Sequence, residues 1–457
     1  MKMRVQHIHL IGIGGIGMSG IAELLFNQGF SVQGSDVAES NNVKRMRSLG
    51  IHVAIGHAAE NLGKAQVVVV SSAIDKTNPE IAAAQLQGIP VIPRAEMLAE
   101  LMRMKQGVAV AGSHGKTTMT SLIAHGMEAA GLDPTYIIGG RLTATGSNAR
   151  LGASPWLIAE ADESDGSFLR LSPTIAVVSN IDPEHLDHYG DFETLMEAFR
   201  TFVSLVPFYG RVVLHHEHPN VAALRENLHK PVTTYGSSPQ ADLHLLESRA
   251  DSEGQIFRAA SRELGELGEF RLPMPGRHNA ENALAAIAVQ LHLGIDIETI
   301  RTSIASFEGI QRRFQRTQVG EGVLVDDYAH HPKEVMATLS AARDCWPERH
   351  MTVVFQPHRF SRTRDLMDDF MGAFDAANEV ALLPIYAASE TEIEGISSDC
   401  MAEGMMVRGH RGVSLVAGLE DAHKLVRSAL ERGDVVLLMG AGSIGSLAQQ
   451  IREEVAA

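Results

Sequence analysis

Two glycine-rich segments constrain the fold of this 457-residue chain more than any other feature. Each follows a short apolar run typical of a buried strand and precedes a run with helical periodicity. A strand, a glycine-rich turn and a helix in this order begin a βαβ unit, which requires a parallel sheet with helices packed on it. We therefore expect an α/β fold, and an all-helical or all-β fold is excluded.

The same alternation continues along the chain. Helical periodicity at 118–130, 279–292 and 332–342 separates several apolar runs, and the more polar stretch 237–270 predicts a small antiparallel insertion. The length suggests about three domains, which we place at 1–106, 107–311 and 312–457. The predicted buried strands are 5–11, 67–72, 108–111, 156–158, 175–179, 212–214, 323–325, 352–355, 380–383 and 435–439.

The net charge of −16 disfavours binding to nucleic acid or to an anionic membrane, which requires a basic surface. No apolar run reaches the roughly 18 residues of a membrane span. The two cysteines cannot form a disulfide framework, and their scarcity suits a cytoplasmic protein. Lys and Arg exceed Asp and Glu slightly within 1–106, so an anionic ligand fits that part of the chain best.

The first glycine-rich segment has the pattern GxGxxG, formed by Gly12, Gly14, Gly15 and Gly17. Such glycines permit a tight turn and a close approach of backbone N–H groups to a diphosphate at a helix N-terminus. Asp36 ends the next predicted strand, where its carboxylate could accept a hydrogen bond from a ribose hydroxyl. NAD, FAD and a UDP-sugar all satisfy this pattern.

The second segment predicts a phosphate-binding loop. Its backbone N–H groups would cradle phosphates, Lys116 would reach the β and γ oxygens, and the Thr117 hydroxyl would bind Mg²⁺. The spacing GxxGKT is two residues shorter than the usual loop, although its place between strand and helix is the same. The loop residues are Gly112, Ser113, His114, Gly115, Lys116, Thr117 and Thr118.

Two further segments that follow predicted strands carry acidic and imidazole groups. Glu160 opens the sequence EADESD, and a carboxylate there suits a nucleotide-bound Mg²⁺. His185, in NIDPEHLDHY, would be an unusual ligand because Mg²⁺ prefers oxygen.

Seven segments in this order resemble the Mur ligases of peptidoglycan assembly: GSHGKTT, EADESD, NIDPEHLDHY, GRHNAENALAA, QRRF, DDYAHHP and FQPHRFSRTRDL. The resemblance covers essentially the whole chain. It implies a three-domain architecture with a Rossmann-like N-terminal domain for the UDP-sugar, a central P-loop-type ATPase domain and a Rossmann-like C-terminal domain for the amino acid. GIGGIGMSG and the last two segments are similar to the branch of the family that joins L-alanine to UDP-N-acetylmuramate.

The resemblance also implies roles for residues. It implies Mg²⁺ binding by Thr117, Glu160 and His185. It implies catalytic roles for Lys116, His185, Arg313, Asp327 and His330. ATP would contact the phosphate loop together with His278, Asn279 and Asn282. The UDP-sugar would contact the first glycine-rich turn, Asp36 and Ser71. The neighbourhood of the amino acid and the sugar carboxylate would contain His330, His358, Arg359 and Arg362.

The implied reaction is an ATP-dependent condensation through an acyl phosphate, in a monomer or homodimer that uses ATP and Mg²⁺. Three alternatives stay open. One is a ligase that attaches a recycled murein tripeptide to the same UDP-sugar. The others are an NAD-dependent dehydrogenase, suggested by Gly12–Gly17 and Asp36, and a UDP-sugar sensor without catalytic activity.

Overall fold

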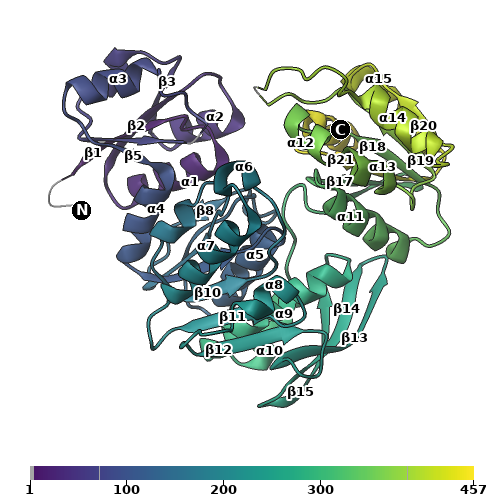
Figure 1. Ribbon diagram of the computed structural model, residues 1–457, viewed down its shortest axis with the longest axis horizontal. Helices are drawn as coiled ribbons and strands as arrows, with labels where there is room; N and C mark the ends of the chain where they lie inside the picture. The colour runs from purple at the N-terminus through teal and green to yellow at the C-terminus, as the bar shows by residue number, and fades with distance from the viewer. Residues whose placement is uncertain (1–4, 72, 389, 457) are drawn as a thin grey trace. The chain divides into compact units, whose positions relative to one another are not determined.

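The computed structural model describes residues 5–71, 73–388 and 390–456. Three sheets organise the chain, and contacts divide it into two compact units (Figure 1). The first unit contains Met1–Leu246, Arg258–Phe270 and Glu281–Phe307. The second contains Glu247–Phe257, Arg271–Ala280 and Glu308–Ala457. Helix α9 therefore contributes residues to both units.

The first sheet has the order β3-β2-β1-β4-β5, and all its strand pairs are parallel. This is the Rossmann strand order 3-2-1-4-5-6 without the sixth strand, so the predicted Rossmann-like N-terminal domain is confirmed. Buried residues of α1, α2 and α4 pack on one face of the sheet, and α3 with the 3₁₀ helix η1 covers the other. The elements are β1 (His7–Ile11), α1 (Ile16–Asn27), β2 (Ser31–Asp36), α2 (Asn41–Ser48), β3 (His52–Ile55), η1 (Ala59–Leu62), β4 (Val67–Val70), α3 (Pro79–Leu86), β5 (Val91–Pro93) and α4 (Arg94–Arg103).

Two predicted strands of this sheet are shorter than the apolar runs suggested. β1 begins at His7 rather than at residue 5, and β4 ends at Val70 because the Ser71 carbonyl accepts from the Ile74 N–H in a turn. Ser72, the end of the predicted strand, lies outside the described residues.

The second sheet has ten strands in the order β15-β14-β13-β12-β11-β10-β6-β9-β7-β8. Connections of two and three residues join β13, β14 and β15, as antiparallel neighbours require, so the predicted insertion is present. The strands are β6 (Gln106–Ala111), β7 (Thr135–Ile137), β8 (Ala149–Arg150), β9 (Trp156–Glu160), β10 (Pro173–Val178), β11 (Arg211–His215), β12 (Val232–Gly236), β13 (Leu243–Asp251), β14 (Gly254–Ser261) and β15 (Gly265–Leu272). The helices are α5 (Lys116–Ala129), η2 (Ser167–Arg170), α6 (Leu186–Tyr189), α7 (Phe192–Ser204), α8 (Pro219–Ala223), α9 (Arg277–His292) and α10 (Ile297–Ala305).

The third sheet has the order β16-β17-β21-β18-β19-β20 and is parallel except for the β16–β17 hairpin. One face packs against α11, α13 and α14, and the other against α15 and α16. The strands are β16 (Gln315–Val319), β17 (Gly322–Asp327), β18 (Met351–Phe355), β19 (Glu379–Leu382), β20 (Val413–Leu415) and β21 (Val435–Met439). The helices are α11 (Pro332–Cys345), α12 (Phe360–Asp365), α13 (Met367–Gly372), α14 (Ser398–Val407), α15 (Leu419–Glu431) and α16 (Ile444–Ala456).

No helix within the described parts of the chain combines the length and the apolar content that a membrane crossing requires.

Candidate functional site

The first glycine-rich turn follows β1, and the protein itself uses most of its backbone N–H groups. Gly12 and Ile13 donate to the Ser35 carbonyl at 2.8 and 3.1 Å, and Gly15 donates to the Gly12 carbonyl at 3.1 Å. Gly14 donates to Oδ2 of Asp36 at 2.8 Å. The first-turn amides of α1 have no acceptor within the helix, so they are the donors that can face an anionic ligand.

The packing around this turn explains why glycine is needed at its centre. A Cβ at Gly14 would lie 2.8 Å from both Oδ2 of Asp36 and Cγ2 of Val43. Gly12 has a φ of +76° and lies against Ile74, in the same loop as Ser71. Asp36 and the loop that contains Ser71 are therefore close to the turn.

Arg94 is a residue that the sequence analysis missed. It is the first residue of α4, and a Cβ at Gly17 would lie 3.0 Å from its Nη1 atom. Its guanidinium is also 3.4 Å from the Asp162 carboxylate. A positive charge at a helix N-terminus interacts unfavourably with the helix dipole. The position of Arg94 at the start of a helix was therefore the sequence signal that could have identified it as a candidate functional residue.

The second glycine-rich segment forms a loop between β6 and α5, as predicted. Gly112 and Gly115 have φ values of +126° and +86°, which residues with a Cβ rarely adopt. The His114 N–H donates to Oδ1 of Asn180 at 2.7 Å, and the Ser179 hydroxyl donates to the His114 carbonyl at 2.7 Å. The end of β10 therefore holds the loop in place.

Lys116 lies inside this loop and is paired with a buried carboxylate. Its Nζ atom is 2.8 and 2.9 Å from the two oxygens of Glu163 and donates to the Gly112 carbonyl at 2.6 Å. Burial by itself opposes the charged form, but the nearby Glu163 carboxylate outweighs it and raises the pKa of Lys116. The lysine is therefore a fixed positive charge at the phosphate loop.

The predicted Mg²⁺ ligands belong to three segments of the first unit. Thr117 is buried in the first turn of α5, and Glu160 ends β9, where Oε1 accepts from the Gly139 N–H at 2.6 Å. The hydroxyl and the carboxylate are hard oxygen donors of the kind Mg²⁺ prefers, so these two residues fit the ion. His185 supplies nitrogen, which fits less well.

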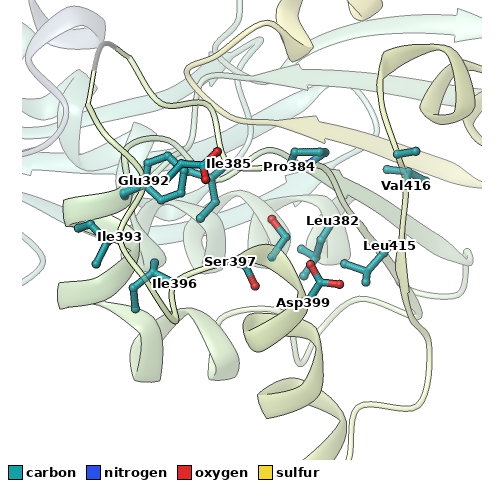
Figure 2. Close-up of a pocket in the computed structure, with 13 residues that line it drawn as sticks. Leu382, Pro384, Ile385, Glu392, Ile393, Ile396, Ser397, Asp399, Leu415 and Val416 are labelled. Carbon is teal, nitrogen blue, oxygen red and sulfur yellow. The ribbon is translucent and has the colours of Figure 1, made fainter.

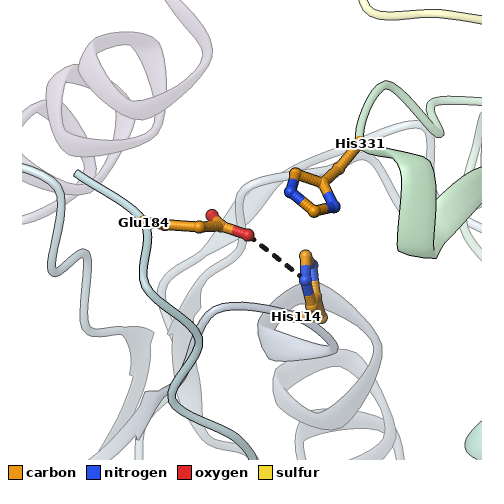
Figure 3. A group of neighbouring side chains, drawn as sticks. All are labelled: His114, Glu184 and His331. Atoms are coloured by element: carbon orange, nitrogen blue, oxygen red, sulfur yellow. Dashed lines mark ion pairs between the residues drawn. The ribbon is translucent and has the colours of Figure 1, made fainter. Parts of the chain in front are cut away.

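His185 has a left-handed backbone with a φ of +58° and precedes α6. This conformation is uncommon outside glycine and marks a constrained loop. Its neighbour Glu184 forms an ion pair with His114 at 3.2 Å, shown as the dashed line in Figure 3. His114 also lies 3.5 Å from Asp182, so the NIDPEHLDHY segment contacts the phosphate loop.

The three predicted residues of GRHNAEN lie at the start of α9. In the first unit, a Cβ at Gly115 would be 2.6 Å from Oδ1 of Asn282, so this amide lies against the phosphate loop. In the second unit, the buried Asn279 donates to the Pro275 carbonyl at 2.7 Å. His278 lies beside Gly276, where a Cβ would be 2.5 Å from its ring.

In the second unit, Asp327 ends β17 and is buried. Its carboxylate accepts from the N–H groups of Phe314 at 2.7 Å and Ala329 at 2.8 Å. Burial is the largest influence and raises the pKa of Asp327 to about 6, although Arg313 and these hydrogen bonds act in the opposite direction. Arg313 lies over the Tyr328 ring, 5.5 Å from its centroid. Arg313 and Asp327 are therefore neighbours.

His330, His358 and Arg362 form a second group in this unit. The two imidazole rings are 6.1 Å apart, and Nη1 of Arg362 is 3.3 Å from Nδ1 of His358. Burial and the Arg362 charge lower the pKa of His358 to about 4, and burial also lowers the pKa of His330. Both rings are therefore neutral near pH 7. Arg359 has a φ of +73° and lies 4.0 Å from Glu390.

A cavity of about 510 Å³ lies at the carboxyl ends of β19 and β20 (Figure 2). Its lining is mainly apolar and includes Phe360 and Ile385, with the carboxylates of Glu392 and Asp399. The described residues that line it include no Lys or Arg, so the cavity does not suit a phosphate or carboxylate ligand.

Three family models match the chain. They are the Mur ligase family catalytic domain at residues 7–106, the Mur ligase middle domain at 110–290, and the Mur ligase, glutamate ligase domain at 312–442. Together they cover most of the sequence.

Two relatives are named UDP-N-acetylmuramate–L-alanine ligase. The protein from Rhodospirillum centenum is 50% identical over 461 residues, which cover 100% of this chain and 95% of the relative. The protein from Rhizobium meliloti is 50% identical over 463 residues, with 100% and 98% covered.

Solved structures of ligases are also similar to this chain over almost its whole length. The UDP-N-acetylmuramate–alanine ligase of Thermotoga maritima is 28% identical, has a TM-score of 0.85 and covers 98% of each chain. A murein peptide ligase from Psychrobacter arcticus is 22% identical, has a TM-score of 0.74 and also covers 98% of each chain. At that identity, the second similarity supports the fold alone.

Proposed function

The chain belongs to the Mur ligase family, and from this premise we propose that it joins L-alanine to UDP-N-acetylmuramate. ATP would drive the reaction and leave as ADP and phosphate. The observation that carries the proposal is the 50% sequence identity, over the whole chain, to relatives named for this reaction. The lysine-bearing phosphate loop supports the ATP requirement, and a dehydrogenase would have no use for it.

The chemistry requires activation because a carboxylate and an ammonium do not condense unaided in water. In the proposed reaction, the lactyl carboxylate of UDP-N-acetylmuramate attacks the γ-phosphorus of ATP and gives an acyl phosphate and ADP. The deprotonated amine of L-alanine then attacks the acyl carbon, and the tetrahedral intermediate expels phosphate. Phosphoryl transfer depends mainly on positioning and on stabilising the charge of the transition state.

In the first unit, we assign the phosphates of ATP to the loop Gly112–Thr118. Lys116 would stabilise negative charge on the transferring phosphoryl group, because its ammonium is fixed and charged. Thr117, Glu160 and His185 would hold Mg²⁺, which neutralises phosphate charge when bound. Asn282 lies against the loop, which supports a role for this asparagine beside the nucleotide. His278 and Asn279 are proposed as further nucleotide contacts.

The UDP-sugar is assigned to the first sheet. The first-turn amides of α1 would bind the diphosphate, while Gly12, Gly14 and Gly15 shape the turn and Gly17 lies in the first turn of the helix. Asp36 and Ser71 remain proposed contacts for the sugar nucleotide.

In the second unit, His330, His358, Arg359 and Arg362 are proposed to hold the amino acid and the sugar carboxylate. The lowered pKa of His330 keeps its imidazole neutral near pH 7, which allows it to accept a proton from the alanine ammonium. Arg313 would stabilise phosphoryl charge, and Asp327 lies beside it. We also propose the domain limits 1–106, 107–311 and 312–457, and a location in the cytoplasm.

Phosphate release from ATP tests this function. The assay contains Mg²⁺ and UDP-N-acetylmuramate, together with L-alanine, the murein tripeptide or neither. Release that depends on L-alanine is expected. Release only with the tripeptide would assign the chain to the peptide-recycling reaction, and no release with either would contradict the ligase proposal.

A further inference from the structure

A buried carboxylate lies at the carboxyl edge of the first sheet, outside the residues assigned to the reaction. The side chains of Glu80 and His9 are both 0% exposed, and Oε2 of Glu80 is 3.0 Å from Nε2 of His9. The same oxygen accepts from the Ser35 hydroxyl at 2.6 Å. The other oxygen accepts from the Asn61 amide at 2.6 Å and from the Ala58 N–H at 3.2 Å. Each oxygen of Glu80 therefore receives two hydrogen bonds.

These donors keep Glu80 ionised. Burial alone would raise its pKa, but the hydrogen bonds from His9, Ser35 and Asn61 lower the pKa to about 2. An ionised side chain inside a protein is costly unless its partners are well placed. The arrangement therefore depends on these donors being held in fixed positions.

Ser35 links this carboxylate to the first glycine-rich turn. Its hydroxyl donates to Glu80, and its carbonyl accepts from the N–H groups of Gly12 and Ile13. The next residue, Asp36, accepts from the Gly14 N–H. The end of β2 therefore sets the path of the turn, and Glu80 holds the side chain of the residue at that end.

Glu80 also joins the segments that follow the neighbouring strands. Ala58 and Asn61 belong to the segment after β3, and Glu80 lies in the first turn of α3, after β4. Ligands of open α/β sheets bind at the carboxyl ends of the strands, where these segments lie. One carboxylate thus connects the segments around the proposed UDP-sugar site.

We propose that Glu80 is a positioning residue for binding of the UDP-sugar and acts through Ser35. By fixing the end of β2, it holds the glycine-rich turn so that the first-turn amides of α1 face the diphosphate. This inference rests on the proposed function, which assigns the UDP-sugar to this turn.

The variant Glu80→Gln tests the proposal because glutamine has nearly the same volume. It removes the charge and replaces one acceptor oxygen with an NH₂ group, which cannot accept from the donors around it. Loss of hydrogen bonds to a charged group predicts a Kd for UDP-N-acetylmuramate raised about tenfold or more. The Kd for a non-hydrolysable ATP analogue should stay within about twofold. Calorimetry on the full chain measures both constants.

Two matched variants separate positioning from simple loss of stability. Val68→Ala shortens a fully buried apolar side chain of the same sheet and removes none of the hydrogen bonds to the carboxylate, so it should lower Tm and leave both Kd values unchanged. Ser35→Ala removes the linking hydroxyl and should also weaken UDP-sugar binding. If Glu80 acts through Ser35, the double variant should bind more tightly than the product of the two single effects predicts.

The outcomes distinguish this inference from the function beneath it. Wild-type binding of UDP-N-acetylmuramate with an unchanged Kd in Glu80→Gln would overturn the positioning role alone. An equal increase in the Kd values of UDP-N-acetylmuramate and the ATP analogue in Glu80→Gln would also overturn the positioning role. So would a higher Kd for UDP-N-acetylmuramate in Val68→Ala when its Tm falls as much as that of Glu80→Gln. Additive effects of Glu80→Gln and Ser35→Ala in the double variant would overturn it as well. Failure of the wild-type chain to bind UDP-N-acetylmuramate would overturn the proposed function and this inference with it.

Discussion

Replacing Lys116 with alanine should affect turnover and stability by two separable routes. The ammonium is 2.8 Å from Glu163, whose side chain is only 2% exposed. Removing one partner of a buried ion pair leaves an uncompensated charge and costs about 3–5 kcal/mol of folding free energy. Removing a donor that stabilises transition-state charge costs about 10²–10³-fold in kcat. Lys116→Ala should therefore be both less stable and nearly inactive, as denaturant unfolding and phosphate release would measure.

The double variant Lys116→Ala, Glu163→Gln separates these two effects. Neutralising Glu163 removes the unpaired charge, so most of the lost stability should return while turnover stays low. Binding of UDP-N-acetylmuramate should be nearly unchanged in both variants, because the first glycine-rich turn lies on a different sheet. Recovery of turnover together with stability would refute the charge-stabilising role of Lys116, and so would near wild-type activity in the single variant.

Three further predictions concern pH and packing. Gly14→Ala should weaken UDP-N-acetylmuramate binding and spare ATP binding in calorimetry, because its Cβ would lie 2.8 Å from Asp36 and from Val43; equal effects on both ligands would contradict the assignment of the turn. Arg362→Ala should raise the pKa of His358 from about 4, because it removes a nearby positive charge, and an NMR titration that finds no rise would reject that cause. The pKa of Asp327 is raised from 3.8 to about 6, so the native state binds the carboxyl proton more tightly than the unfolded chain does. The protonated carboxyl therefore contributes stability that is complete below about pH 4 and is lost as the pH rises through 6. Asp327→Asn should flatten the pH dependence of the unfolding free energy between pH 4 and 6, and an unchanged pH dependence would contradict the raised pKa.

Local sequence signals predicted the elements that carry the site. The glycine-rich turns, the phosphate loop of Lys116 and the strand before Glu160 follow from short-range patterns of strand, turn and helix. The strand limits were less accurate, because the run 67–72 stays apolar or small beyond Val70, where β4 ends and a turn begins.

Partners that lie far apart in the sequence could not be predicted from these patterns. Glu163 is 47 residues from Lys116, and Glu80 is 45 residues from Ser35. Nothing in the spacing of such residues shows that their side chains meet, since the sheet order decides it. The hydrogen bond from the Gly14 N–H to the Asp36 carboxylate could not be predicted either. The pattern GxGxxG predicts only that the amides of the turn face an anionic ligand.

The backbone conformation of the QRRF segment could not be predicted from the sequence either. Arg312 and Phe314 have φ values of +59° and +47°, which no residue type there signals. The Phe314 N–H donates to the buried Asp327, and the Arg312 carbonyl accepts from the Tyr328 N–H. These hydrogen bonds offset the local strain, and they form only when β17 is in place.

Transfer of oxygen-18 tests the central claim of carboxylate activation most directly. UDP-N-acetylmuramate labelled in the lactyl carboxylate is incubated with ATP, Mg²⁺ and L-alanine, and the released phosphate is examined by mass spectrometry. An acyl phosphate predicts that one labelled oxygen appears in the phosphate for each amide bond formed, because the carboxylate oxygen that attacks phosphorus leaves with it. Amide formation with unlabelled phosphate would contradict the acyl-phosphate mechanism.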